Sequence, residues 1–310
     1  MFMLRDLWGR PLTTIRINVT SKCNFSCVFC HREGEREPWN KEELSVEDFA
    51  VIARAAYNLG IRRIKLTGGE PLVRRDMIDV VETIKKYGNP RDLSMTTNGS
   101  FLEDYAEPLK RAGLQRVNVS LHSLFPERYR YITRKDLLDK VVKGILKAKD
   151  IGLRIKINTV VIKGFSKQEL EKLIEFANKY EIDIQLIELQ PVGLGKRVFD
   201  KYFQPLDTVK EILFEMSSKR TIRVEQHFRD VFIVKNIRVE LVKAYNNHLF
   251  CLGCNRVRIT SNGLILPCIM RDVGVPLLDI LHSDKSFNKK VEEVQSRFIL
   301  ANILRRPFYR

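Results

Sequence analysis

Segments with strand character alternate with amphipathic segments of helical spacing over the first two thirds of the chain. Strands are predicted at residues 13–20, 61–67, 92–98, 115–121, 153–161 and 182–190. Helices are predicted at residues 46–59, 76–87, 103–112, 136–150 and 167–180, with starts at Ser45, Asp76 and Ser166. Because connections between parallel strands are right-handed crossovers, this repetition predicts an α/β fold whose parallel sheet is either doubly wound or curled into a barrel.

The predicted strands alternate apolar and polar side chains, which is unusual for strands that helices cover. Ile15 and Ile17 flank Arg16 in the first strand, and Lys65 and Lys156 are similarly flanked in the second and fifth. Successive side chains of a strand point to opposite faces, so the polar faces must converge on an open, hydrated interior if helices cover the apolar faces. Several cations in one interior require an anionic ligand, such as a polyphosphate. An antiparallel sheet with one face in solvent gives the same alternation, but the intervening helices argue against it.

The pattern changes after Pro205. A helix is predicted near residues 206–217, followed by shorter strands at 221–226, 230–235 and 237–244 and by a helix near 287–303. We therefore expect two domains that pack together, residues 1–204 as the βα repeat and residues 205–310 as a smaller α+β domain.

Charge and hydropathy narrow the class of protein. The formal net charge is +16 and the pI about 9.6, which favours an anionic partner such as a nucleotide, a nucleic acid or an acidic protein. No apolar run reaches the ~20 residues that span a bilayer, so we expect a cytoplasmic protein without a membrane partner. Disulfides are not expected in a reducing cytosol.

The cysteines form two groups of three. Cys23, Cys27 and Cys30 directly follow the first predicted strand, and Cys251, Cys254 and Cys268 lie in the second domain. Three thiolates are one too few for a closed structural zinc site, whereas a cubane cluster with three protein thiolates leaves one iron free to bind another group. Zinc sites completed by a histidine remain the alternative, and His31 and His248 are the histidines nearest to the cysteines in sequence.

The first group resembles the hallmark motif of the radical S-adenosylmethionine superfamily. The spacing C-x3-C-x2-C with an aromatic residue, Phe29, before the third cysteine matches that motif, and LTGGEP at residues 66–71 is similar to the family's GGE segment. The resemblance implies that the free iron chelates S-adenosylmethionine and that one electron from the cluster releases a 5′-deoxyadenosyl radical. Paired glycines also let a backbone approach a ligand closely.

The whole chain resembles the GTP 3′,8-cyclase family, which performs the first step of molybdopterin biosynthesis. The match includes C-x2-C-x-R-x-R at residues 251–258 with Cys268 fourteen residues after Cys254, and the segments MTTNG, VNVSLHS and IELQPVG in the same order. The resemblance implies a partial, open (β/α)6 TIM-type barrel with a smaller auxiliary-cluster domain. It implies two [4Fe-4S] clusters and S-adenosylmethionine as cofactors. It also implies that hydrogen is removed from ribose C3′ of GTP and that this carbon attacks C8, giving (8S)-3′,8-cyclo-7,8-dihydroguanosine 5′-triphosphate.

The same resemblance assigns roles to individual residues. The first cluster would be held by Cys23, Cys27 and Cys30 and the second by Cys251, Cys254 and Cys268, with the first three cysteines, Arg256 and Arg258 as the catalytic set. S-adenosylmethionine would contact Phe29, Gly69, Ser120 and Gln190. GTP would contact Arg16, Lys65, Thr96, Lys156, Arg256, the backbone at Val257 and Arg258. An electron donor such as ferredoxin or flavodoxin, the downstream cyclic pyranopterin monophosphate synthase and a monomeric or homodimeric state are further implications.

Four positions depart from the family pattern. Lys65 stands where Arg is frequent, Gln190 where Met is usual, and His122 where Asp is frequent. Bacterial members end in a catalytic Gly-Gly tail, whereas this sequence ends in RRPFYR. Either another group, such as Arg305 or Arg306, replaces the tail, or the substrate differs.

Two other functions fit part of the sequence. A radical enzyme with an auxiliary cluster could act on a peptide or another nucleotide, although the peptide-modifying relatives with larger auxiliary domains use seven cysteines there. A basic iron–sulfur or zinc protein could bind RNA, but the strands show no clear aromatic platforms among their basic residues, so no nucleic-acid partner is expected.

Overall fold

A computed structural model of the chain describes residues 3–35 and 42–307. Its described strands form a single sheet of twelve, in the order β12-β11-β10-β1-β2-β3-β4-β5-β6-β9-β8-β7. The strands are β1 (Thr14–Asn18), β2 (Arg63–Thr67), β3 (Asp92–Thr97), β4 (Arg116–Ser120), β5 (Arg154–Val161), β6 (Asp183–Glu188), β7 (Lys219–Arg223), β8 (Arg229–Val234), β9 (Ile237–Val242), β10 (Arg256–Ile259), β11 (Leu264–Leu266) and β12 (Val275–Pro276).

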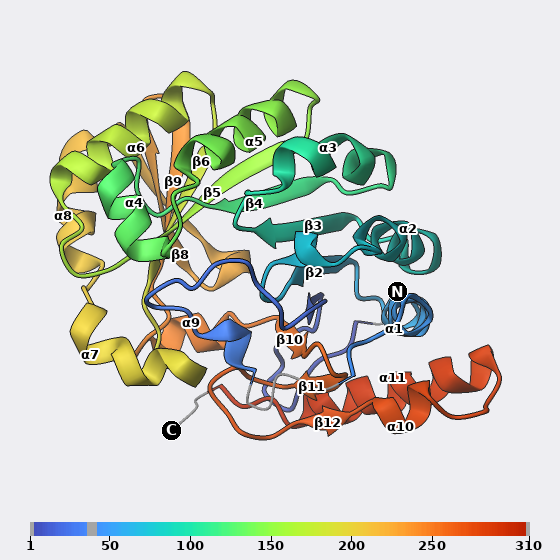
Figure 1. The fold of residues 1–310 in the computed structure, drawn as a ribbon. Coiled ribbons are helices and arrows are strands. Elements are labelled where there is room, and N and C mark those ends of the chain that lie inside the picture. The colour runs from blue at the N-terminus through green and yellow to red at the C-terminus, as the bar shows by residue number, and fades with distance from the viewer. Residues whose placement is uncertain (1–2, 36–41, 308–310) are drawn as a thin grey trace.

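Helices connect the strands and cover the outer side of the curved sheet (Figure 1). The α-helices are α1 (Val46–Asn58), α2 (Met77–Gly88), α3 (Leu102–Arg111), α4 (Pro126–Thr133), α5 (Leu138–Asp150), α6 (Lys167–Lys179), α7 (Phe199–Tyr202), α8 (Asp207–Met216), α9 (His248–Leu252), α10 (Leu278–Leu281) and α11 (Phe287–Ile303). Short 3-10 turns are η1 (Arg32–Gly34), η2 (Pro71–Val73), η3 (Gly193–Val198) and η4 (Val224–Gln226). No helix in the described ranges is both long and apolar enough to cross a membrane.

The six predicted βα strands are confirmed as β1 to β6. Each pairs with the next in parallel, so an antiparallel sheet with one solvated face is wrong for this part of the chain. The predicted helix starts at Ser45 and Ser166 are confirmed, and both form capping boxes with the third helical residue, Asp48 and Glu169. Asp76 precedes α2 but its side chain makes no capping hydrogen bond. Helix α4 was not predicted from the sequence.

Strands from the last third of the chain extend both edges of the βα sheet. Strand β10 pairs in parallel with β1, and β9 pairs in parallel with β6, so the sheet curls as a partial barrel that the later strands widen on either side. Strands β7 and β8 continue antiparallel from β9, and β11 and β12 continue antiparallel from β10. The division into domains 1–204 and 205–310 stays a prediction.

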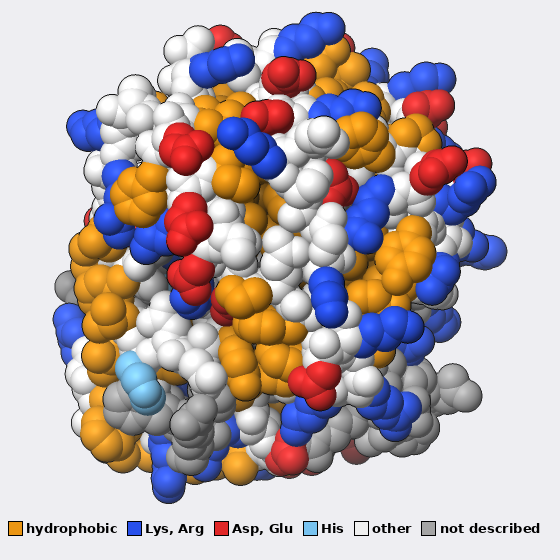
Figure 2. Space-filling view, turned by 90° about the vertical axis from the view of Figure 1, so that its left-hand side faces the viewer, with side chains coloured by type: hydrophobic (Ala, Val, Ile, Leu, Met, Phe, Trp, Pro, Cys, Tyr) orange, Lys and Arg blue, Asp and Glu red, His pale blue; other side chains and the backbone are white. Residues whose placement is uncertain are grey.

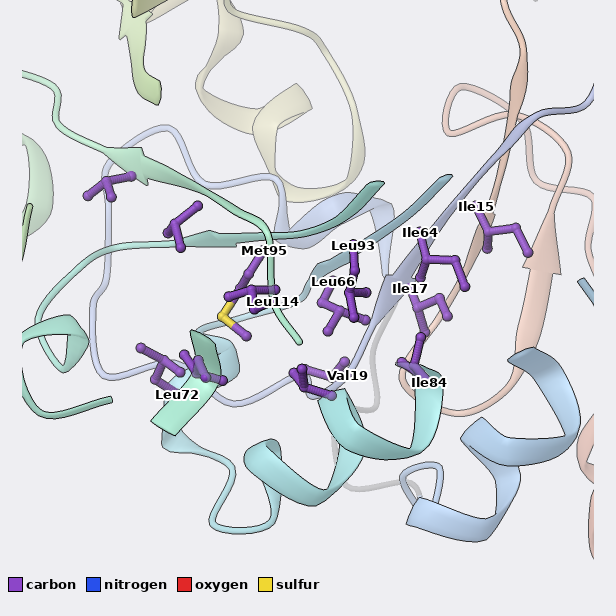
Figure 3. Packing of buried hydrophobic residues seen from close by; sticks show 14 of the residues in the cluster. Ile15, Ile17, Val19, Ile64, Leu66, Leu72, Ile84, Leu93, Met95 and Leu114 are labelled. Carbon is purple, nitrogen blue, oxygen red and sulfur yellow. The ribbon is translucent and has the colours of Figure 1, made fainter. Parts of the chain in front are cut away.

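The core lies between the apolar strand faces and the helices. Ile15, Ile17, Leu66 and Met95 are fully buried, and Figure 3 shows them packed together with Ile84 from α2. Each such side chain contributes about 1.5 to 3 kcal/mol when it is removed from water. The apolar side chains of the alternating strands therefore lie on the outer face of the sheet, where they form the core with the helices.

The polar side chains of the alternating strands face the inside of the barrel. Arg16 is in register with Lys65 on one side and with Arg258 on the other, and Asn118 is in register with Lys156. Residues in register on neighbouring strands share a face of the sheet. On the outer face shown in Figure 2, by contrast, lysines and arginines are interspersed with acidic and apolar side chains. The three cations predicted for the interior, Arg16, Lys65 and Lys156, thus lie on the inner face of the sheet.

Candidate active site

The inward face of the sheet encloses two adjoining compartments. The upper compartment lies at the carboxyl ends of the strands, and all six cysteines of the sequence line it. The lower compartment opens at the amino ends, and lysines and arginines form the largest group of the residues that line it. Arg16, Gln185, Arg229 and Arg256 line both compartments, so the two meet in the middle of the barrel.

The first thiol group lies on the loop after β1, where βα folds place reactive groups. Two hydrogen bonds fix this loop against the end of α4, because the amides of Ser26 and Val28 donate to the carbonyls of Thr133 and Ile132 over 3.4 and 3.0 Å. The amide of Phe25 donates to Cys23 Sγ over 3.3 Å, and backbone donation of this kind favours a thiolate.

All three thiols of the first group are free and lie close together, since Cys30 and Cys23 both help to raise the pKa of Cys27 and Cys30 helps to raise that of Cys23. Burial raises the pKa of Cys23 to about 11 and raises those of Cys27 and Cys30 as well. Thiolates in such surroundings require a strongly cationic partner, which an iron–sulfur cluster provides. The donor set therefore fits a cubane cluster with one iron left for another ligand.

The second thiol group is surrounded by arginines. Arg10 donates to the carbonyl of Cys251 over 2.8 Å, and Arg305 donates to the carbonyl of Cys254. Burial alone would raise the pKa of Cys254, but Arg305 and Arg256 lower it below its usual value. The three thiols are again free and close enough to affect one another, as a second cluster requires.

In the described part of the chain, no three His, Cys, Asp or Glu side chains converge as the ligands of a single metal ion would. An iron–sulfur cube distributes its thiolates over separate irons and does not need such convergence. His31, one of the histidines considered for zinc, lines the upper compartment, and its Nδ1 has no hydrogen-bond partner among the described residues.

The residues predicted to contact S-adenosylmethionine, Phe29, Gly69, Ser120 and Gln190, all line the upper compartment. The structure gives a reason for Gly69 that differs from ligand approach: a Cβ at this position would lie 2.0 Å from the carbonyl oxygen of Lys22. The backbone after β2 thus packs directly on the cysteine loop, and the amide of Glu70 donates to the same carbonyl over 2.8 Å. Only glycine permits this approach.

Glu70 in turn orders the next loop. Its carboxylate accepts hydrogen bonds from Thr97 Oγ1 and from the amide of Asn98, both over 2.6 Å, and from the amide of Leu72 over 3.1 Å. Burial raises the pKa of Glu70 to about 7 despite these donors. The GGE segment therefore ties the loops after β1, β2 and β3 into one rigid rim.

The predicted substrate contacts divide between the compartments. Arg16, Thr96, Arg256, Val257 and Arg258 line the upper compartment. Lys65 and Lys156 line the lower compartment, beyond Arg16 and Arg256. An elongated anion with a ring at one end could reach both sets at once.

Comparisons with known proteins agree with this geometry. Residues 17–177 match the family model of the Radical SAM superfamily, and residues 182–306 match that of Molybdenum Cofactor Synthesis C. The chain is 42% identical over 308 residues to a probable GTP 3′,8-cyclase of Sulfurisphaera tokodaii, covering 98% of this chain and 96% of the relative. It is also 42% identical to a probable GTP 3′,8-cyclase of Aeropyrum pernix, covering 99% of this chain and 88% of that one.

This chain belongs to the GTP 3′,8-cyclase family of the radical SAM superfamily. Solved structures support the fold: Streptococcus suis SuiB bound to precursor peptide SuiA has a TM-score of 0.65 at 19% identity, with 89% of this chain and 66% of that one covered. Native anSMEcpe with bound AdoMet has a TM-score of 0.55 at 15% identity, with coverage of 93% and 82%. The partial barrel of the superfamily is thus confirmed.

His122, which departs from the family pattern, and the two arginines considered in place of the Gly-Gly tail have defined surroundings. His122 is buried against Phe29, with ring centroids 4.9 Å apart, and its Nδ1 accepts a hydrogen bond from the amide of Val160 over 3.2 Å. Arg305 is buried and also bonds to Asn302 over 2.9 Å, so its guanidinium holds the second thiol loop in place. Arg306 is exposed and lines the upper compartment. A role of either arginine in place of the family's Gly-Gly tail stays a prediction.

Several charged residues of the site were not predicted. Glu240 on β9 accepts from Lys156 over 2.9 Å, from Arg223 over 2.6 Å and from Arg229 over 3.3 Å. Glu33 in η1 pairs with Arg258 and Arg16. Glu240 alternates with apolar neighbours on its strand, which could have shown its inward direction; Glu33 carries no sequence signal.

Proposed function

We propose that this protein converts GTP into (8S)-3′,8-cyclo-7,8-dihydroguanosine 5′-triphosphate in molybdenum cofactor biosynthesis. The observation that carries the proposal is that two incomplete thiol groups, distant from each other in the sequence, line one compartment together with Arg16, Arg256 and Arg258. One group suits a cluster that holds S-adenosylmethionine, and the other suits a cluster that binds a second molecule through its free iron.

The residues of the chain have distinct tasks in this proposal. Phe29, Gly69, Ser120 and Gln190 hold S-adenosylmethionine beside the first cluster, which Cys23, Cys27 and Cys30 bind. When bound, the cofactor and this cluster supply one-electron chemistry that removes the hydrogen atom at ribose C3′.

The substrate lies across the two compartments. Arg256 and Arg258 hold it beside the second cluster, which Cys251, Cys254 and Cys268 bind, and the backbone at Val257 and the hydroxyl of Thr96 add hydrogen bonds. Arg16, Lys65 and Lys156 neutralise the phosphates toward the lower opening, and Arg258, in register with Arg16, also reaches them; guanidinium and ammonium groups bind phosphate oxygens well. Bringing C3′ and C8 together in one fixed geometry is the main contribution of this side of the site.

The free thiols fit a reducing compartment such as the cytoplasm, and an electron donor such as ferredoxin or flavodoxin would have to reduce the first cluster. The downstream partner would be cyclic pyranopterin monophosphate synthase.

Anaerobic reconstitution followed by incubation with GTP, S-adenosylmethionine and a reductant tests the proposal. We expect about eight irons per chain and formation of the cyclised nucleotide. The Arg256→Ala variant should retain uncoupled cleavage of S-adenosylmethionine but lose about 10- to 100-fold in GTP turnover, since a charged hydrogen bond contributes about 1.5 to 3 kcal/mol. Unchanged GTP, with both clusters present, would favour a peptide or another nucleotide as substrate.

A further inference from the structure

Glu33 lies where the two halves of the site meet. Its Oε2 atom pairs with Nη1 of Arg258 on β10 and lies 3.9 Å from Nη1 of Arg16 on β1. Its Oε1 atom accepts a hydrogen bond from Thr67 Oγ1 at the end of β2 over 3.3 Å. The side chain is 17% exposed and lines the upper compartment. One carboxylate thus bridges three strands across the inside of the barrel.

Glu33 is the counter-ion of the two arginines proposed to bind the substrate. Within residues 3–35 and 42–307, no other carboxylate forms an ion pair with Arg16 or Arg258. Lys65, in register with Arg16, has no ion-pair partner among the same residues. The surrounding positive charge therefore exceeds what one carboxylate can balance, and a more highly charged anion would be preferred there.

The backbone around Glu33 is held in an uncommon conformation. Arg32 and Glu33 are consecutive non-glycine residues with positive φ, 46° and 51°. The segment is fixed from both sides, because a Cβ at Gly34 would lie 2.8 Å from Ile269 and the next carboxylate, Glu35, accepts from Asn18 and Ser261 over 2.8 and 2.9 Å. A conformation of this kind persists only where its surroundings enforce it, and it presents the carboxylate of Glu33 to the arginines.

We propose that Glu33 is a built-in competitor of the substrate's phosphates, which occupies the guanidinium groups of Arg16 and Arg258 and is displaced when a polyphosphate binds. The inference rests on the proposed function, since it takes both arginines as substrate contacts. When a site is blocked part of the time, its apparent affinity for a ligand equals the affinity of the open site multiplied by the fraction of time that the site is open. Glu33 therefore lowers the affinity of the site for every anion by the same factor, and a ligand with several phosphates still binds tightly enough to displace it.

The experiment compares wild type with Glu33→Gln as reconstituted protein without reductant, so that no turnover occurs. Equilibrium dialysis measures the Kd of three probes: GTP, inorganic tripolyphosphate and guanosine. We expect Glu33→Gln to bind GTP and tripolyphosphate about tenfold more tightly and guanosine unchanged. Glu35→Gln is the matched control, because it removes a buried carboxylate from the same segment that contacts no arginine within residues 3–35 and 42–307. Its three Kd values should stay within about twofold of wild type.

Unchanged or weaker binding of tripolyphosphate by Glu33→Gln would overturn the inference. Weaker binding of guanosine would instead make Glu33 a contact of the base and would overturn it equally. If Glu33→Gln does not fold, judged by iron content and thermal midpoint, Glu33→Asp provides the test: its shorter carboxylate cannot reach both arginines, so tripolyphosphate should bind about threefold more tightly, and an unchanged Kd would count against the inference. Failure of wild type to produce the cyclised nucleotide would refute the proposed function. The Kd values of wild type and Glu33→Gln for tripolyphosphate could still be compared.

Discussion

The two compartments of the barrel interior are built from the same alternating strands but differ in chemistry. The upper one is lined by the six thiols, by Phe29 and by the loops after β1 to β3. Among the described residues, no cysteine lines the lower one, which instead holds Lys65, Lys156 and arginines from five or more strands and loops. Position along the strand therefore separates the six thiols from Lys65 and Lys156.

This separation suits a substrate that is reactive at one end and highly charged at the other. A carbon radical needs surroundings without other groups that could give it a hydrogen atom. Loops at the carboxyl edge of the sheet provide adaptable positions for cofactors. Phosphates need fixed cations, which strand positions hold rigidly. The comparison can be tested by changing one compartment and asking whether the function of the other survives.

The largest effect is expected in the upper compartment. Cys23→Ala removes one of three thiolates of the first group and should lower cleavage of S-adenosylmethionine by at least about 10³-fold, ~4 kcal/mol of activation free energy. Cys268→Ala should leave uncoupled cleavage within a few-fold of wild type but stop product formation. Chromatographic measurement of 5′-deoxyadenosine and of the nucleotide product checks both. Equal loss of cleavage in both variants would contradict the division of labour between the thiol groups.

A smaller and more specific effect is expected from the two lysines of the lower compartment. Lys65 has no ion-pair partner among the described residues, and burial together with Arg16 lowers its pKa well below the usual value. Lys65→Ala should raise KM for GTP about 10- to 100-fold without loss of thermal stability, because the change removes a poorly solvated charge. Lys156 is already paired with Glu240 over 2.9 Å. Lys156→Ala should therefore destabilise the fold by about 1 to 3 kcal/mol and change KM less than Lys65→Ala.

Steady-state kinetics and thermal unfolding on the same samples distinguish the two lysines. Lys147→Ala, on the exposed side of α5, is the control for removal of a positive charge and should change neither quantity. If Lys156→Ala raised KM as strongly as Lys65→Ala and left stability unchanged, the ion pair with Glu240 would have to open on substrate binding.

The side of the sheet on which a residue lies was predictable, whereas its long-range partners were not. The alternation around Arg16 and Lys65 correctly separated side chains that pack against the helices from side chains that face the inside of the barrel. It could do so because successive side chains of a strand point to opposite faces, which depends only on neighbouring residues. The pairing of β10 with β1 joins Arg16 to Arg258 across most of the chain and has no local signal. The same holds for Glu240, which lies 84 residues from Lys156, and for Glu33, whose direction depends on two positive φ angles in a loop.

The chemical role of a motif was predictable where the spacing of its residues suits a particular ligand. Three thiols after the first strand indicated a cluster, and their position at the carboxyl edge followed from the fold. That the thiol groups lie in one compartment could be inferred only through the family resemblance, since residues 23 and 251 have no contact signal in the sequence.

The smallest effect concerns His122, a neutral group of the upper compartment. Burial lowers the pKa of His122 to about 4, and its Nδ1 accepts the amide of Val160, so the ring is neutral with its proton on Nε2. Below the unfolded pKa of about 6.5 the unfolded chain binds a proton that the folded ring does not, so stability falls as the pH decreases toward 4. Between pH 7.5 and 5.5 this loss should be about 1 kcal/mol. His122→Gln should remove that part of the pH dependence in thermal unfolding scans, whereas His248→Gln, at an exposed histidine outside the barrel core, should retain it. Identical slopes in wild type and His122→Gln would show that the folded ring binds a proton as readily as the unfolded one, and at pH 5.5 the upper compartment would then carry an additional cation beside Phe29.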